Sequence, residues 1–140
     1  MAQPELRVTV LENAGDVRGS SFQTGAGWLG FLGSVEDAHI ATILPGQIRG
    51  NHYHVRRREV IAVLYADAWQ LAWDNGADTE VNLIQFAGSG AVLLEADPLA
   101  SHAIENTGAA LLWIVGLSNG AWDEHAPDAY PRRLLPRTQP

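Results

Sequence analysis

Short apolar stretches alternate with polar and turn-forming residues along most of this chain. Each stretch is rich in β-branched and aromatic side chains, which is typical of β-strands. The predicted strands are Leu6–Leu11, Ile40–Leu44, Val60–Tyr65, Trp69–Trp73, Val81–Phe86, Val92–Leu94 and Leu111–Leu117. Between two of them lies Asn75-Gly76, a dipeptide that favours a β-hairpin. Regularly spaced short strands with such turns predict an all-β sandwich or barrel.

The segments outside these strands differ in composition. Gly15–Gly33 carries six glycines and no strong helical pattern, so we expect it to run irregularly before the barrel. The tail after Trp122 is rich in proline and arginine, which indicates an arm lying over the surface or over a partner subunit. No internal repeat is present, so we expect a single domain. Residues 1–35 then form an N-terminal strand and glycine-rich segment, residues 36–120 the barrel core, and residues 121–140 a C-terminal arm.

Composition narrows the function classes. The chain has 140 residues, of which 46% are hydrophobic and 18% charged, as in ordinary soluble domains. Its formal net charge of -7 argues against nucleic acid or an anionic membrane as a partner. The absence of cysteine excludes disulfides, thiolate catalysis and cysteine-bound metal clusters. With no apolar run long enough to span a membrane and no signal-peptide pattern, we expect a cytoplasmic protein.

Three histidines and one glutamate form the most informative polar pattern. In an extended chain side chains alternate between faces, so His52 and His54 project from one face of a strand while Tyr53 points the other way. Glu59 follows on the next strand, and His102 comes much later in the chain. Imidazole and carboxylate groups that converge in this way suit a divalent metal.

The same residues resemble the first conserved motif of the cupin superfamily. That motif reads Gly-x5-His-x-His-x4-Glu-x6-Gly. Its first four fixed positions are matched by Gly46, His52, His54 and Glu59, whereas Ala66 stands in place of the last glycine. The resemblance implies a single-domain double-stranded β-helix, the jelly-roll barrel of the cupins.

The second cupin motif ends in His-x3-Asn, which His102 and Asn106 match, although Ala100 replaces the glycine of its earlier portion. In metal-binding cupins the matching positions are ligands. The resemblance therefore implies a divalent metal ion held by His52, His54, Glu59 and His102. Zn, Fe, Mn and Ni all suit these donors, and an octahedral shell would leave two positions for water or substrate.

A narrower resemblance concerns the string Arg49-Gly50-Asn51-His52-Tyr53-His54. It is similar to the metal-binding cupin domain of capsular polysaccharide sugar epimerase/reductases and to a segment of the nucleotide-sugar 3,4-ketoisomerases. The ending at 126–131 resembles that of the sugar-nucleotide 3,5-epimerases. These relatives usually form dimers and act on nucleotide-linked deoxy-sugars. The resemblance implies an isomerase or epimerase that acts on a keto-sugar nucleotide or a related polyhydroxy carbonyl compound.

The mechanism that this resemblance implies depends on one position. The 3,5-epimerases carry glutamine where this chain has His54, bind no catalytic metal and use the first histidine as a base. His54 therefore favours a metal-dependent reaction, in which the metal polarises a carbonyl and stabilises an enediolate. A small-molecule substrate such as a nucleotide sugar and a homodimer are expected. Exchange of Leu6–Leu11 or of the tail would complete the dimer.

Two further residues are candidates for catalysis. Arg49 could hold a substrate phosphate or carboxylate at the barrel mouth, although its odd offset from His52 would turn it away from the imidazoles on a regular strand. An ordinary surface arginine is an equally good interpretation. Tyr53 is a candidate proton donor, although tyrosines also commonly fill cores and interfaces. The basic run at 56–58 is interpreted as a solvated turn beside the expected mouth, with attraction of a diphosphate as the alternative.

Other polar and aromatic residues match no motif position. His39 and His125 are interpreted as ordinary surface or core residues, and Trp122 as part of a lid or a subunit contact. Two alternative functions stay open. One is a mononuclear-iron oxygenase, for which three histidines and a glutamate would also serve. The other is a non-catalytic small-molecule-binding or sensor cupin, because a fold does not by itself specify a function.

Overall fold

The computed structural model describes residues 2–136, and most of its regular structure is β-strand. The elements in these residues are β1 (Leu6–Leu11), α1 (Gly27–Leu32), β2 (Asp37–Ile43), β3 (Ile48–Tyr53), β4 (Glu59–Tyr65), β5 (Trp69–Asp74), β6 (Asn82–Phe86), β7 (Gly90–Ala96), β8 (Ser101–Glu105), β9 (Leu112–Ser118) and β10 (Tyr130–Pro131). The all-β class expected from the alternating sequence pattern is confirmed.

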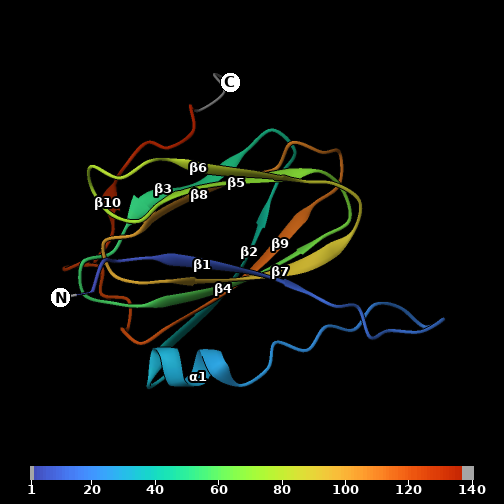
Figure 1. Cartoon of the computed structure of the whole chain (residues 1–140), viewed down its shortest axis with the longest axis horizontal. Helices are drawn as coiled ribbons and strands as arrows, with labels where there is room; N and C mark the ends of the chain where they lie inside the picture. Colours follow the sequence, from blue (N-terminus) through green and yellow to red (C-terminus); the bar gives the residue numbers. More distant parts are fainter. Residues whose placement is uncertain (1, 137–140) are drawn as a thin grey trace.

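The strands form two five-stranded sheets that face each other (Figure 1). The strand orders are β1-β7-β4-β9-β2 and β10-β3-β8-β5-β6, with antiparallel pairing throughout. Each sheet draws strands from both halves of the chain, which is the arrangement of a double-stranded β-helix. The predicted hairpin is also present, because β5 and β6 pair on either side of the turn that contains Asn75-Gly76.

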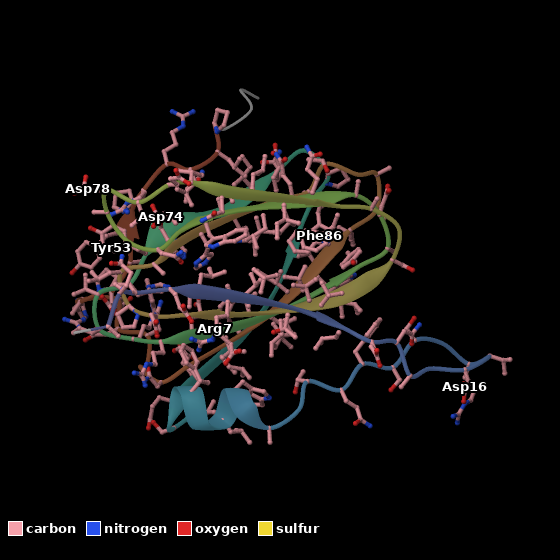
Figure 2. The ribbon with its side chains drawn as sticks, in the orientation of Figure 1. Arg7, Asp16, Tyr53, Asp74, Asp78 and Phe86 are labelled. Atoms are coloured by element: carbon pink, nitrogen blue, oxygen red, sulfur yellow. The ribbon has the colours of Figure 1, made fainter. Side chains whose placement is uncertain are left out.

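The core lies between the sheets, where alternate residues of each strand point inward (Figure 2). It is made of aliphatic side chains and one fully buried tryptophan: Leu6, Ile43, Ile61, Val63, Trp69, Leu71, Val92, Leu94, Ile104, Leu112 and Ile114, with the two small residues Ala96 and Ala100. Burial of this apolar area is the main favourable term in folding. The period-two pattern of the strands therefore decides which side chains fill the barrel.

The glycine-rich segment is more ordered than its composition suggests. Residues 13–22 form a narrow hairpin that projects from the barrel, and α1 follows it (Figure 1). The sequence analysis missed this helix because it has only six residues, four of them glycine or leucine. Its apolar residues Trp28, Phe31 and Leu32 have the i, i+3, i+4 spacing of one helical face. They pack on the outer face of β4 and β7, so a tertiary contact stabilises a helix with weak intrinsic propensity.

Both ends of the chain pair with strands of the same chain. β1 pairs with β7, and β10 pairs with β3. Both strands therefore have partners within this chain, and a homodimer, with or without strand exchange, stays a prediction. Across residues 2–136 the structure contains no helix with the length and apolar character needed to cross a bilayer.

Candidate metal centre

The three histidines come from two adjacent strands. His52, on β3, lies directly opposite His102, on β8, and His54 follows at the end of β3. The two strands approach each other closely at Gly50, two residues before His52. Only glycine fits there, since a Cβ atom at this position would lie 2.6 Å from the carbonyl oxygen of His102. As expected from the strand alternation, His52 and His54 both line one cavity.

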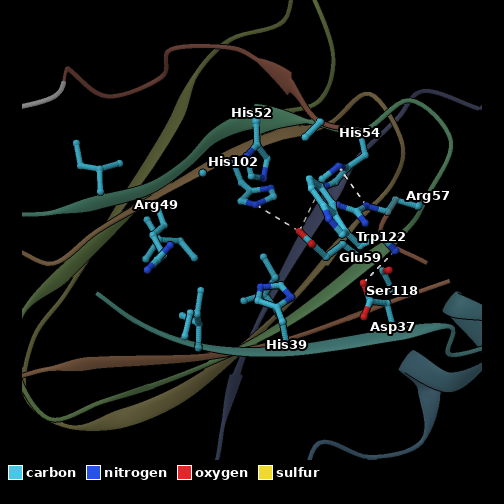
Figure 3. Close-up of a pocket in the computed structure, with 17 residues that line it drawn as sticks. Asp37, His39, Arg49, His52, His54, Arg57, Glu59, His102, Ser118 and Trp122 are labelled. Atoms are coloured by element: carbon cyan, nitrogen blue, oxygen red, sulfur yellow. Dashed lines mark hydrogen bonds and ion pairs between the residues drawn. The ribbon is translucent and has the colours of Figure 1, made fainter. Parts of the chain in front are cut away.

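Glu59 reaches this cluster from the opposite sheet, because it is the first residue of β4. Its Oε1 atom lies 3.4 Å from Nε2 of His102 and 3.5 Å from Nε2 of His54 (Figure 3). Donor atoms of His52, Glu59 and His102 all lie within 4.8 Å of one another. His54 falls outside this group of three but faces the same carboxylate. The structure thus brings together all four residues that the sequence analysis selected.

A hydrogen bond of His54 determines which of its ring nitrogens faces the cluster. Its Nδ1 atom contacts the main-chain carbonyl oxygen of Asp128, and a carbonyl can only accept, so Nδ1 carries a proton. The Arg57 Nε group, 3.4 Å from the same Nδ1 atom, therefore cannot donate to it. The other ring atom, Nε2, then faces Glu59.

Several buried polar atoms of these side chains have no hydrogen-bond partner. Nε2 of His54 and Oε1 of Glu59 are buried without a hydrogen bond, and so is Nδ1 of His102. In the neutral ring the Nε2 lone pair faces the carboxylate, and a positive charge between the two atoms, carried by a proton or by a metal ion, relieves their repulsion. Ligands about 2.0–2.2 Å from a metal lie about 3 to 3.6 Å apart, which agrees with both distances to Glu59. The residues present fit a divalent metal ion.

Burial and mutual proximity shift the pKa values of the cluster. Burial lowers the pKa of His52 to about 3, and the nearby imidazoles of His102 and His54 act in the same direction. Burial also lowers the pKa of His102. For Glu59 burial acts in the opposite direction, but the imidazoles of His54, His102 and His52 together outweigh it and lower the pKa to about 2. At His54 burial lowers the pKa, but the Glu59 carboxylate and the Asp128 main-chain carbonyl together outweigh burial and raise the pKa.

A cavity of about 730 Å³ opens from this cluster between the two sheets. Polar and aromatic residues line it around the cluster: Asp37, His39, Arg49, Arg57, Ser118 and Trp122 (Figure 3). Its apolar walls include Ile48, Ile61, Ile104 and Ile114. Trp122, expected in a lid or a subunit contact, is thus a wall residue of the same chain.

The expectation that Arg49 faces away from the imidazoles is wrong. Gly50 pairs with Ala103 while His52 pairs with His102, so Asn51 is an extra residue in β3. Asn51 takes up the bulge with a φ of 56°. A bulge of this kind resets the alternation of side chains, and Arg49 therefore lines the cavity together with His52. Its Nε group donates to the carbonyl oxygen of Thr42 at 3.0 Å, which holds the guanidinium against β2.

His39 is the residue that the sequence analysis most clearly overlooked. It lies on β2, on the sheet opposite His52 and His102, and lines the cavity. Its cross-strand partner is Gly116, where a Cβ atom would lie 2.3 Å from Cε1 of the His39 ring. The ring therefore occupies space that only glycine leaves free. The sequence did contain a clue, because Asp37, His39 and Ala41 alternate along β2 and so share its inward face.

Tyr53 is not brought into the cavity. It lies on the other face of β3, where its ring stacks on Tyr130 with 5.5 Å between ring centroids. The guanidinium carbon of Arg132 lies 4.8 Å from the Tyr53 ring centroid. The Tyr53 side chain therefore packs against the C-terminal arm, outside the cavity, where it cannot act as a proton donor to a substrate bound there.

The chain has the two-sheet jelly-roll fold of the cupins, with three histidines and a glutamate gathered on its inner side. Residues 32–130 match the family described as the polysaccharide biosynthesis C-terminal domain. The match covers more than half of the chain, which therefore belongs to this family. No curated protein matches the chain in sequence.

Several solved structures share the fold. The chain is similar to the 3,4-ketoisomerase QdtA from Thermoanaerobacterium thermosaccharolyticum, a mutant of which was solved with TDP-4-keto-6-deoxyglucose. The TM-score is 0.65 at 17% identity, over 89% of this chain and 86% of that one. A dTDP sugar isomerase from Desulfovibrio desulfuricans gives a TM-score of 0.72 at 9% identity, over 92% and 84% of the two chains.

The chain is also similar to the capsular polysaccharide assembling protein CapF from Staphylococcus aureus. The TM-score is 0.60 at 20% identity, over 88% of this chain. This chain spans only 34% of the length of CapF. At these identities the comparisons show a common fold.

Proposed function

We propose that this cupin is a metal-dependent isomerase or epimerase acting on a keto-sugar nucleotide or a related polyhydroxy carbonyl compound. The observation that carries the proposal is the cluster of buried, unpartnered donor atoms from His54 and Glu59, with His52 and His102 beside them. This cluster lies in a cavity of about 730 Å³, within the range of about 300–1,000 Å³ usual for small-molecule sites.

A divalent metal held by His52, His54, Glu59 and His102 would supply positive charge that polarises a substrate carbonyl. The chain's other residues would bind and orient the substrate. Arg49 carries terminal guanidinium nitrogens suited to a phosphate or carboxylate group, while its Nε group is anchored on β2. The isoleucines of the cavity wall would exclude water around the reacting carbons.

A proton must also move between neighbouring carbons in such a reaction, and the position of His39 in the cavity lining supports this role for it. Its imidazole lies across the cavity from the cluster and is exposed to the cavity's solvent. An imidazole can accept a proton and return it without being consumed. Because His39 belongs to the sheet opposite the three other histidines, it would act on a substrate held between the sheets.

The known proteins support the substrate class. The family is described by polysaccharide biosynthesis. The structure of QdtA contains a keto-sugar nucleotide, and that protein covers most of this chain. The presence of His54 rather than glutamine supports the metal-dependent form over the metal-free base mechanism.

Metal content is the first test. Protein purified without a histidine tag is analysed for bound elements, in parallel with His52→Ala and with His125→Gln as a control outside the cavity. Near-stoichiometric Zn, Fe, Mn or Ni in the unchanged protein and in the control, lost in His52→Ala, is the expected result. A metal-free protein with a folded His52→Ala variant contradicts metal dependence.

Turnover is the second test. TDP-4-keto-6-deoxyglucose is incubated with the metal-loaded protein in D₂O, and NMR follows both new sugar isomers and deuterium on carbons next to the carbonyl. Isomer formation with deuterium incorporation, abolished by a chelator and restored by metal, is expected. Oxygen consumption instead of isomerisation would indicate an oxygenase. Binding without turnover or exchange would indicate a sensor.

A further inference from the structure

The C-terminal arm is tied to β3 on both sides of the His52–His54 pair. Before the pair, the side chain of Asn51 accepts hydrogen bonds from the main-chain N–H groups of Leu134 and Leu135, at 2.9 and 3.1 Å. Its amide group donates to the carbonyl oxygen of Leu135 at 3.1 Å. The residue that creates the bulge therefore also fastens the arm.

After the pair, the arm is fastened by Asp128. The carboxylate of this residue accepts three main-chain N–H groups of the turn between β3 and β4: those of Val55 at 2.9 Å, Arg56 at 2.9 Å and Arg57 at 3.0 Å. Asp128 is only 7% exposed, so water competes little for these bonds. The turn links His54 to Glu59, which means that one carboxylate organises the segment carrying two candidate ligands.

The same residue also contacts His54 directly. The main-chain carbonyl oxygen of Asp128 accepts the Nδ1–H of the His54 ring. This contact decides which nitrogen is left for the cluster, since Nδ1 is engaged and Nε2 faces Glu59. Metal-binding histidines generally use such a contact to fix the tautomer and the ring orientation.

We propose that Asp128 is a positioning residue that presents Nε2 of His54 to the candidate metal centre. Two groups of Asp128 take part. Its carboxylate binds the turn between β3 and β4, and this attachment positions its main-chain carbonyl to accept the Nδ1–H of the His54 ring. The part of this proposal that involves a metal rests on the proposed function, whereas the positioning of the His54 ring does not. Asp128 is 74 residues from His54 in sequence, so the arm acts as part of the site and not only as a cover.

Two variants test the carboxylate while leaving the main-chain carbonyl in the sequence. Asp128→Ala removes the acceptors for all three turn amides, and Asp128→Asn keeps one acceptor oxygen but turns an NH₂ group toward the remaining amides. Arg132→Gln is the matched control, because it removes the 2.9 Å ion pair between the arm and Asp74 without touching His54. Circular dichroism and urea unfolding establish that each variant is folded.

Two measurements are made on each variant. Nitrogen-15 spectra of the histidine rings follow the exchange of the His54 Nδ1–H with water, and this measurement needs no metal. Competition with a chelator measures zinc affinity. In Asp128→Ala we expect faster exchange of Nδ1–H and zinc binding weaker by about 10- to 100-fold, with a smaller effect in Asp128→Asn and none in Arg132→Gln.

A folded Asp128→Ala protein with unchanged Nδ1–H exchange or unchanged zinc affinity overturns the proposal. An equal loss of affinity in Arg132→Gln also overturns it, because arm attachment in general would then be responsible. If the unchanged protein binds no metal, the proposed function fails separately. The exchange of the His54 ring proton then decides alone whether Asp128 positions this side chain.

Discussion

The two ends of the barrel interior are built on the same strands but filled in opposite ways. Along β4 the inward side chains are Glu59, Ile61, Val63 and Tyr65, in that order. Glu59 faces the histidine cluster at one end, whereas Tyr65 packs against aromatic rings at the other. There the rings of Trp69 and Phe86 stack with 4.3 Å between centroids and 8° between planes.

The difference separates an end that stabilises the fold from an end that is suited to binding a ligand. Apolar burial at the aromatic end stabilises the fold directly. Burial of ionisable groups at the histidine end costs free energy unless a charge or a hydrogen bond compensates. Among the described residues, the aromatic end leaves the Trp69 Nε1 atom without a partner, while the histidine end leaves atoms of three different residues. An end that keeps so many unpartnered polar atoms close together is suited to binding a ligand.

The largest effect is expected at the aromatic end. Trp69→Ala should lower the free energy of unfolding by about 3–5 kcal/mol, because the indole is fully buried and stacked. Urea denaturation measures the change. Trp113→Ala, at a residue 47% exposed on the outer face, is the matched control and should cost less than about 1 kcal/mol. Equal losses in the two variants would contradict the division into a stabilising end and a binding end.

At the histidine end the expected loss is in binding and not in folding. His54→Gln should weaken zinc binding by more than about 100-fold, since it removes a candidate ligand and not merely a residue that supports one. Urea unfolding of the metal-free protein should change little by comparison with Trp69→Ala. Chelator competition measures the affinity, with His125→Gln as the exposed control. Turnover that survives in metal-free His54→Gln would favour a free-histidine base mechanism.

An effect that is spread over several pH units should appear in the stability of the metal-free protein. Because burial lowers the pKa of His52 from 6.5 to about 3, the unfolded chain binds this proton more readily in that interval. The free energy of unfolding must therefore fall as the pH falls from about 6.5 toward 3, with a contribution of up to about 1.4 kcal/mol per pH unit.

Urea unfolding at several pH values tests this contribution. His52→Gln should show a shallower decrease of stability in acid than the unchanged protein, whereas His125→Gln should leave the slope as it is. The side chain of His125 is 86% exposed, which makes it the appropriate reference. Identical slopes for all three proteins would mean that His52 does not resist protonation in the folded state.

The smallest effect is expected opposite the cluster. Gly116→Ala places a Cβ atom 2.3 Å from the present position of His39 Cε1, so the ring must move. Turnover of TDP-4-keto-6-deoxyglucose should fall by no more than about tenfold, or about 1.4 kcal/mol, because the exposed ring can adopt another rotamer. Zinc affinity should not change. A loss of zinc affinity would show that β2 supports the histidine end more directly than the contacts indicate.

The fold class and the candidate ligands could be predicted because both depend on local patterns. Alternating apolar residues define strands, and His52 and His54 share a face at a spacing of two. The cupin motif added Glu59 and His102, which the structure places around the same point. The alternation failed for Arg49 because the bulge at Asn51 adds a residue to β3, and no local pattern predicted that bulge.

The sequence by itself thus determined the two-sheet barrel and the identity of the four converging polar residues, since strand periodicity and motif spacing are properties of short segments. Only the tertiary structure decided that His39 and Trp122 line the cavity and that Asp128 holds His54. These contacts join segments far apart in the chain. They depend on how the sheets face each other and where the arm lies, which are consequences of packing the whole chain.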